Sequence, residues 1–335
     1  MHVPLRRLAL VPEPHPGESL LSWVDALARV NRVSRFAALR LAGLIRSNAP
    51  SVQPPASFGF HVADTVARDV YLATGVPPER VQEMVLAQYA GRGLTPLPQR
   101  HPQGAESMRT WRNQQQMVLR RRSNACPTCL RGSGGRWLLK WRLAWAFACV
   151  HHQRYLISAC RGCGAALHPL RPGTANSWIC PGPAPGLGLF KPTRPCGRDI
   201  RGMRPEPVRD SQLLECQQRI DMLLEGRGEG GAGALDVFDA LYRSLQDACS
   251  LVRPAALPDT DDVVRRAWDR FQAPEGCKTW REPLIVAGAT KIATGTVQLP
   301  EMFAVSTRMA SRVLSAAKRT SRTSCAGFPG LGATE

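Results

Sequence analysis

The chain has 335 residues, which allows two or three domains, and a hydrophobic content of 44% is enough for ordinary cores. No apolar run approaches the ~20 residues of a membrane span and Met1 to Leu10 lacks the apolar region of a secretory signal, so we expect a soluble, cytoplasmic protein. Lys and Arg number 44 against 26 Asp and Glu, and the resulting charge of +18 favours a polyanionic partner, above all DNA.

Apolar residues at helical spacing predict an N-terminal helical domain over residues 1–100. Pro16 stands where a helix start tolerates proline, so Glu18 is expected in the first turn. The helix should run to about Val30, with Trp23 at the edge of its apolar stripe. Further helices are expected at 35–42, at 61–74, and from Pro77 or Pro78 to about Leu86.

The last two of these helices are joined by a short link at Gly75, which allows a helix-turn-helix with 79–86 as its recognition helix. Two packed core helices explain the same pattern. Glu79 and Glu83 argue against direct contact between the second helix and phosphates. The following segment, 91–104, is rich in Pro and Gly and predicts a linker.

Seven cysteines and one histidine between residues 126 and 196 have the spacing of metal ligands. Two ligands separated by two residues can point at one ion, and a second pair completes a tetrahedron, so the sequence predicts two structural Zn²⁺ ions. His151 is an alternative to His152, although the two-residue spacer selects His152. The expected ligands are Cys126, Cys129, Cys149 and His152 for the first ion, and Cys160, Cys163, Cys180 and Cys196 for the second.

The alternative to zinc is a disulfide framework, which needs an oxidising compartment. Cys180 and Cys196 are single thiols in a Pro- and Gly-rich run, so their pairing stays open at this point. Four sulfur or nitrogen ligands leave no open position for water, and P-loop, GxSxG and HExxH motifs are absent from the sequence. We therefore expect structural metal sites and no enzyme activity.

The zinc region is the most basic part of the chain, since residues 100–204 contain 18 Lys or Arg and only two acidic residues. Such a segment attracts nucleic acid, although a solvated basic face is the alternative. Trp111 and Trp178 could stack on bases, or simply pack. The expected phosphate contacts are Arg120, Arg121, Arg122, Arg131, Arg136, Lys140, Arg142 and Arg154 around the first zinc site, with Arg308 and Arg312 near the C-terminus.

The rest of the chain predicts a helical domain at 205–319 and a disordered tail at 320–335. Residues 299–318 have the sequence pattern of a helix-turn-helix, although an ordinary amphipathic helix also explains the pattern. With 101–204 as a tandem zinc-finger or zinc-ribbon domain, the predicted fold is mainly α with small zinc-binding modules. The other C-terminal helices are expected at 213–224, 235–251 and 261–271, with a flexible break at 226–233.

Two stretches carry recognisable motifs. The zinc region has Cys-Pro-x-Cys-Leu at 126–130, a Trp-rich segment at 141–145, and then the pairs starting at Cys149 and Cys160. Near the N-terminus, Pro-x-Pro is followed by Gly-Glu-Ser-Leu-Leu-Ser-Trp at 17–23. Together they resemble the TniQ/TnsD family of transposition target-selection proteins over about residues 8–196.

The resemblance implies an adaptor for target-site selection that binds target DNA, or a complex already on it, and recruits an AAA+ ATPase. That ATPase would engage a separate transposase. Some family members dock on an RNA-guided CRISPR complex, and this mode and a homodimer both stay open. An autonomous zinc-dependent transcription regulator and a protein-interaction scaffold whose charge is incidental are the alternative functions.

Overall fold

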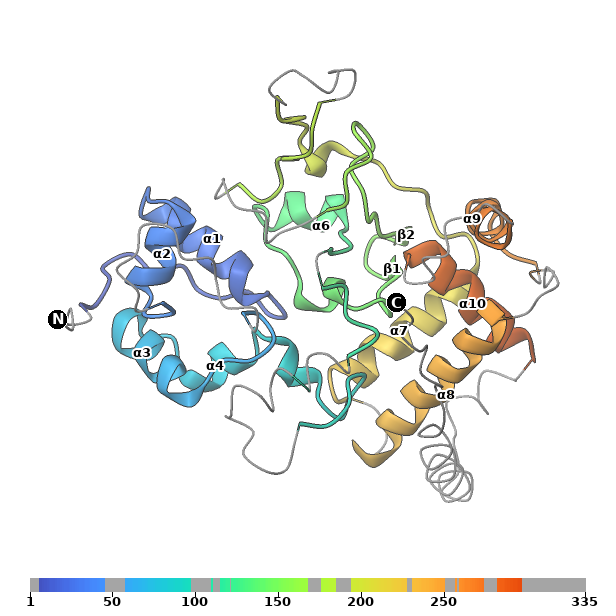
Figure 1. Cartoon of the computed structure of the whole chain (residues 1–335), viewed down its shortest axis with the longest axis horizontal. Coiled ribbons are helices and arrows are strands. Elements are labelled where there is room, and N and C mark those ends of the chain that lie inside the picture. The colour runs from blue at the N-terminus through green and yellow to red at the C-terminus, as the bar shows by residue number, and fades with distance from the viewer. Residues whose placement is uncertain are drawn as a thin grey trace, which may run out of the picture.

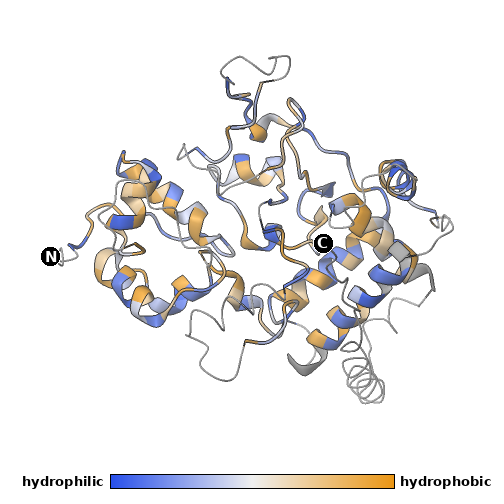
Figure 2. Ribbon diagram, in the orientation of Figure 1, coloured by the Kyte–Doolittle hydropathy of each residue, from blue (hydrophilic) through white to orange (hydrophobic). Residues whose placement is uncertain are grey.

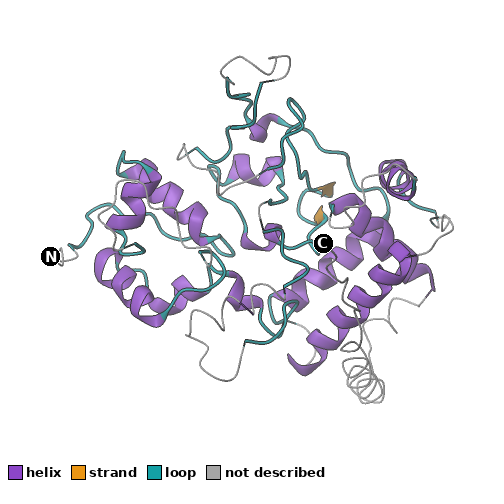
Figure 3. Ribbon diagram, in the orientation of Figure 1, coloured by secondary structure: helices purple, strands orange, loops and turns teal. Residues whose placement is uncertain are grey.

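Helices are the main regular secondary structure of the described chain, and the strands found there form one short antiparallel pair (Figure 1, Figure 3). The mainly α character predicted from the sequence is confirmed for these residues. In Figure 1 the N-terminal helices lie at one end, the C-terminal helices at the other, and the cysteine-rich segment between them. The computed structural model describes residues 6–45, 58–97, 110, 115–120, 122–167, 176–184, 194–227, 231–250, 257, 259–273 and 282–296.

The N-terminal unit contains α1 (Leu20–Val30), α2 (Arg35–Leu41), α3 (Asp64–Thr74) and α4 (Pro78–Gln82), which surround an apolar core of their own. The side chains of Ser19 and Ser34 cap the first two helices by accepting hydrogen bonds from the amides of Ser22 and Ala37. Helix α3 ends at Gly75 with a φ of 80°, a left-handed conformation that glycine adopts without steric cost. Local capping signals therefore set these boundaries.

Two expectations for α1 are wrong. Ser19 is the N-cap, so Glu18 precedes the helix, and its carboxylate accepts hydrogen bonds from the His15 amide and the Ser22 hydroxyl. Trp23 is completely buried, and its Nε1 donates to the Pro12 carbonyl at 2.9 Å, because the extended N-terminal segment covers that side of the helix.

The expected recognition helix over 79–86 does not form, since α4 is only five residues long. The backbone turns after it and pairs elsewhere: the Leu20 amide donates to the Met84 carbonyl, and the Leu86 amide donates to the Gly59 carbonyl. Val81, Met84 and Leu86 are buried. Helices α3 and α4 are therefore packed core helices, which was the alternative interpretation.

The central region is built from short elements joined by turns. Strands β1 (Ala148–Cys149) and β2 (Arg154–Tyr155) pair in antiparallel fashion around the turn at 150–153. The helical turns are η1 (Leu86–Tyr89), α6 (Pro127–Gly132), η2 (Leu139–Arg142) and η3 (Ile200–Gly202).

The C-terminal region contains α7 (Ser211–Leu224), α8 (Gly231–Ser250), α9 (Asp262–Gln272) and α10 (Pro283–Thr296). The first three follow the predicted pattern, but α8 begins inside the expected break at 226–233. Helix α10 was not predicted, because its Gly, Thr and β-branched residues lower its intrinsic helix propensity. Its burial against α7, α8 and α9 supplies the stability that propensity does not. The predicted helix-turn-helix at 299–318 and the tail at 320–335 lie outside the described residues.

One large apolar core joins the central region to the C-terminal helices. Figure 2 shows hydrophobic residues along the ribbon in both of these regions. The Trp145 ring packs against Phe238 with 5.4 Å between ring centroids. On α7, the Gln217 side-chain oxygen accepts hydrogen bonds from the amides of Phe147 and Ala148, which fixes β1 against that helix. This core therefore runs across the expected boundary at residue 204. Within the described ranges, no helix is both long and apolar enough to cross a membrane.

Candidate metal centres and basic surface

The first cluster brings together Cys126, Cys129, Cys149 and His152, which is one of the two predicted ligand sets. The Nδ1 atom of His152 lies 3.6, 3.2 and 3.5 Å from the sulfurs of Cys126, Cys129 and Cys149 in that order. The sulfurs of Cys129 and Cys149 are 3.6 Å apart. His151, the alternative in the sequence, is exposed and not part of the cluster.

Local structure explains why these four side chains converge. Cys126 is the N-cap of α6 and Pro127 starts that helix, so Cys129 returns to the same side one turn later. Cys149 ends β1, and the tight turn after it, with Gln153 at a φ of 49°, brings His152 back toward the strand. A helix start and a hairpin turn therefore each supply one pair.

The second cluster contains Cys160, Cys163, Cys180 and Cys196, the other predicted set. Cys160 and Cys196 have their sulfurs 4.0 Å apart, and the sulfurs of Cys163 and Cys180 are 3.5 Å apart. Backbone pairing across the module brings in the two single thiols, since the Cys196 amide donates to the Gly182 carbonyl. The pairing left open by the sequence is therefore decided by these loop contacts.

The donor sets and their spacing fit a tetrahedral ion. In each cluster all four ligand atoms lie within 4.8 Å of one another. Two sulfurs bound tetrahedrally at ~2.3 Å would be ~3.8 Å apart, close to the separations seen here. A disulfide needs ~2.05 Å, and the eight cysteines whose side chains are described are all free. Both clusters can hold a metal ion, and the geometry does not support the disulfide alternative.

The coupled thiols of the first cluster differ chemically from the isolated thiol of Cys216. Hydrogen bonding to Cys129 holds the pKa of Cys126 far below its usual range, and the same contact raises the pKa of Cys129, so Cys126 is favoured as the thiolate that a metal requires. Burial among apolar side chains raises the pKa of Cys216 to about 12, so that thiol stays protonated and inert. Cys216 lies on α7 within the large apolar core and belongs to neither cluster.

A buried ion pair fastens α1 to the first metal module. The Arg136 guanidinium donates to both carboxylate oxygens of Glu18, at 2.9 and 2.7 Å, and Glu18 is fully buried. Beside this pair, the Ser19 amide donates to the Trp137 carbonyl, and the Trp137 amide donates to the Ser22 hydroxyl. The Gly-Glu-Ser motif near the N-terminus is thus part of the contact with the metal module.

Trp178 makes a second contact, between the second metal module and α1. The guanidinium carbons of Arg29 and Arg201 lie over its ring, 4.6 and 4.5 Å from the centroid. The same ring leaves no room for a side chain at Gly135, where a Cβ would come within 2.0 Å of it. These contacts favour the packing role of Trp178 over base stacking, and Trp111 lies outside the described residues.

Two predicted phosphate contacts face inward instead. Arg142 is buried, donates to the Gly59 carbonyl at 3.1 Å and lies over the Phe60 ring. Burial lowers its pKa to about 10. Arg136 is held by Glu18, as described above. The structure therefore gives Arg136 and Arg142 roles in packing, because each donates hydrogen bonds to a buried acceptor that lies far away in the sequence.

The other predicted contacts lie nearer the surface, and most have a protein partner. Lys140 pairs with Asp221, Arg122 with Glu282, Arg154 with the Pro205 carbonyl, and Arg131 with the Arg201 carbonyl. Arg120 is exposed, whereas Arg121, Arg308 and Arg312 lie outside the described residues. Four exposed arginines close to the second cluster in sequence were not among the predicted contacts, namely Arg161, Arg194, Arg198 and Arg204.

A single family model matches the N-terminal unit and the first metal module together. Residues 9–156 match the TniQ family model, a range that begins in the extended segment over α1 and ends just after His152. No curated protein matches the chain. The matched range contains both partners of the Glu18 to Arg136 ion pair and the complete first cluster. This part of the chain, residues 9–156, is therefore similar to the TniQ family, whose members are associated with target selection in transposition.

Proposed function

We propose that the chain is a target-site adaptor in DNA transposition. It binds target DNA, or a complex already on that DNA, and recruits an AAA+ ATPase that engages a separate transposase. The observation that carries this proposal is the TniQ match over residues 9–156, within which α1 and the first metal module form one packed unit. Because the metal clusters have four protein donors each, the chain contributes recognition and not catalysis.

Both clusters are proposed to hold Zn²⁺. Sulfur-rich, tetrahedral donor sets of Cys₃His and Cys₄ type are typical of structural zinc. Bound metal would fix α6, the hairpin turn and the loops of the second module relative to one another.

Insertion assays test the proposal. With a transposase and an AAA+ ATPase from one element, adding the chain should direct insertions to a defined set of sites, and its omission should abolish or redirect them. The purified chain alone should neither cleave DNA nor hydrolyse ATP. If insertion frequency and sites are the same with and without the chain, the proposal is wrong and a transcription regulator becomes the leading function.

DNA affinity should depend on the exposed arginines around the metal modules. We expect that Arg131→Ala, Arg198→Ala and Arg204→Ala together weaken binding to any duplex. Each lost phosphate contact should reduce the slope of log affinity against log salt by about 0.9, hence about 2.7 if all three contact phosphates. Fluorescence anisotropy over a salt series measures both effects.

A charge-matched variant separates local contact from total charge. Arg68→Ala, Arg265→Ala and Arg266→Ala remove the same three charges from exposed positions on α3 and α9. This variant should retain the wild-type slope. Equal slopes in both triple variants would show that the arginines of the metal region are only a solvated face.

A further inference from the structure

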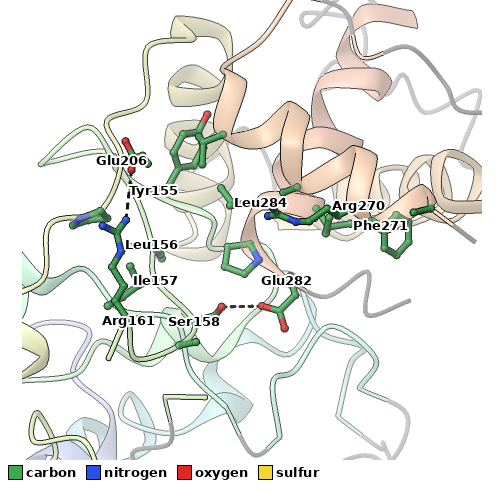
Figure 4. A pocket seen from close by; sticks show the side chains of 17 residues that line it. Tyr155, Leu156, Ile157, Ser158, Arg161, Glu206, Arg270, Phe271, Glu282 and Leu284 are labelled. Carbon is green, nitrogen blue, oxygen red and sulfur yellow. Dashed lines mark hydrogen bonds and ion pairs between the residues drawn. The ribbon is translucent and has the colours of Figure 1, made fainter. Parts of the chain in front are cut away.

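An open groove lies where the central region meets the C-terminal helices (Figure 4). Its volume is about 820 Å³. One wall is the segment 155–161, which begins in β2 just after the first metal cluster, and the other is formed by α9 and the start of α10. The lining is mainly apolar and includes Ile157, Val263, Phe271 and Leu284.

Two ion pairs line the groove and satisfy its carboxylates. Arg161 and Glu206 lie 3.7 Å apart at one side. At the other, Glu282 accepts a hydrogen bond from the Ser158 hydroxyl at 2.8 Å and pairs with Arg122. The contacts of Glu282 bridge the two walls, so the shape of the groove depends on the packing of α10 against the segment that follows the metal cluster.

Arg270 also lines the groove, and it is a charged residue that takes part in neither of these ion pairs. It is exposed on α9 and extends toward Leu284 across the groove (Figure 4). No residue in the described part of the chain forms an ion pair or hydrogen bond with it. The groove therefore combines apolar walls with one available cation, and its complement is an apolar group that carries a negative charge.

A polypeptide segment fits this chemistry better than nucleic acid. A cavity of this size accommodates large apolar side chains, each of which gains about 1.5–3 kcal/mol on full burial. Phosphates of a duplex would lose hydration against the apolar walls without enough cations to replace it. A carboxylate beside the apolar side chains would pair with Arg270 at the exposed edge.

We propose that this groove binds a segment of a partner protein that carries large apolar side chains next to acidic residues. The identification of the partner as the AAA+ ATPase rests on the proposed function, whereas the groove itself rests on its lining and charge. Recruitment would then use a surface that lies mostly outside the residues 9–156 that match the family model, since α9 and α10 supply one wall and most of the other wall follows residue 156.

Synthetic peptides test the groove with the full-length chain. The probes are fluorescein-labelled helical peptides with Leu and Phe anchors four positions apart and flanking Glu residues, and matched peptides with Lys in place of Glu. The Glu peptides should bind at least about tenfold more tightly than the Lys peptides, because only they can pair with Arg270. Arg270→Glu should weaken Glu-peptide binding by about the same factor.

Arg266→Glu is the matched control, since Arg266 is exposed on the same helix and does not line the groove. It should leave peptide binding unchanged. The proposal is overturned if no peptide binds, if Glu and Lys peptides bind equally, or if the two variants behave alike. It is also overturned if Arg270→Glu weakens DNA binding and not peptide binding, which would make the groove edge a nucleic-acid contact.

A recruitment assay with the purified ATPase separates this inference from the proposed function. If the wild-type chain binds the Glu peptides in the groove but does not recruit the ATPase to DNA, the proposed adaptor function is wrong and the proposed groove is supported. If the ATPase is recruited equally by wild type and Arg270→Glu while the Glu peptides fail to bind, the adaptor function is supported and the groove proposal is wrong.

Discussion

Replacing Cys126 or Cys129 with serine should unfold the first metal module and reduce the bound zinc from about two ions per chain to about one. Structural zinc contributes on the order of 10 kcal/mol to the folding of a small module, far more than any other local interaction here. Much of the apolar surface of Trp137 and Trp141, which pack edge to face beside the cluster, would become exposed. Elemental analysis and tryptophan fluorescence measure the two effects.

Cys216→Ala is the control for this experiment, because Cys216 is a buried thiol outside both clusters. The substitution should cost some stability through a small cavity but leave the zinc content unchanged. A wild-type chain that contains no zinc, or one whose cluster cysteines form stable disulfides, would contradict the proposed metal sites.

Glu18→Gln should destabilise the chain by about 3–5 kcal/mol, the usual cost of removing one partner from a buried ion pair. The Arg136 side chain is only 11% exposed, so its charge would remain largely buried without a counter-ion. The glutamine amide would also present donors to Arg136 in place of one carboxylate oxygen. Chemical denaturation monitored by fluorescence gives the change in the free energy of unfolding.

Glu83→Gln provides the comparison, since Glu83 is 55% exposed and pairs with Arg80 on the surface of the same unit. Surface pairs of this kind contribute about 0–1 kcal/mol. If the two substitutions destabilise the chain equally, the buried pair does not fasten α1 to the metal module in the way that the structure indicates.

Local signals in the sequence determined the starts of α1 and α2 and the metal ligands. Ser19 and Ser34 cap helices because their hydroxyls reach amides three residues ahead, a contact that needs no other part of the chain. The Cys126 and Cys129 pair is similar, since one helical turn places both sulfurs on the same side. The TniQ resemblance followed from these same motifs and is confirmed over residues 9–156.

Only the tertiary structure decided which charged residues face inward. Glu18 and Arg136 are 118 positions apart, and Arg142 reaches a carbonyl 83 positions away, so no local pattern distinguishes them from arginines at the surface. Helix α10 and the groove beside Arg270 likewise depend on distant partners. Spacing along the chain determines which nearby residues can cap a helix or bind one metal ion. Burial depends on which distant surfaces pack against each other, and that packing is set by the sum of many weak contacts.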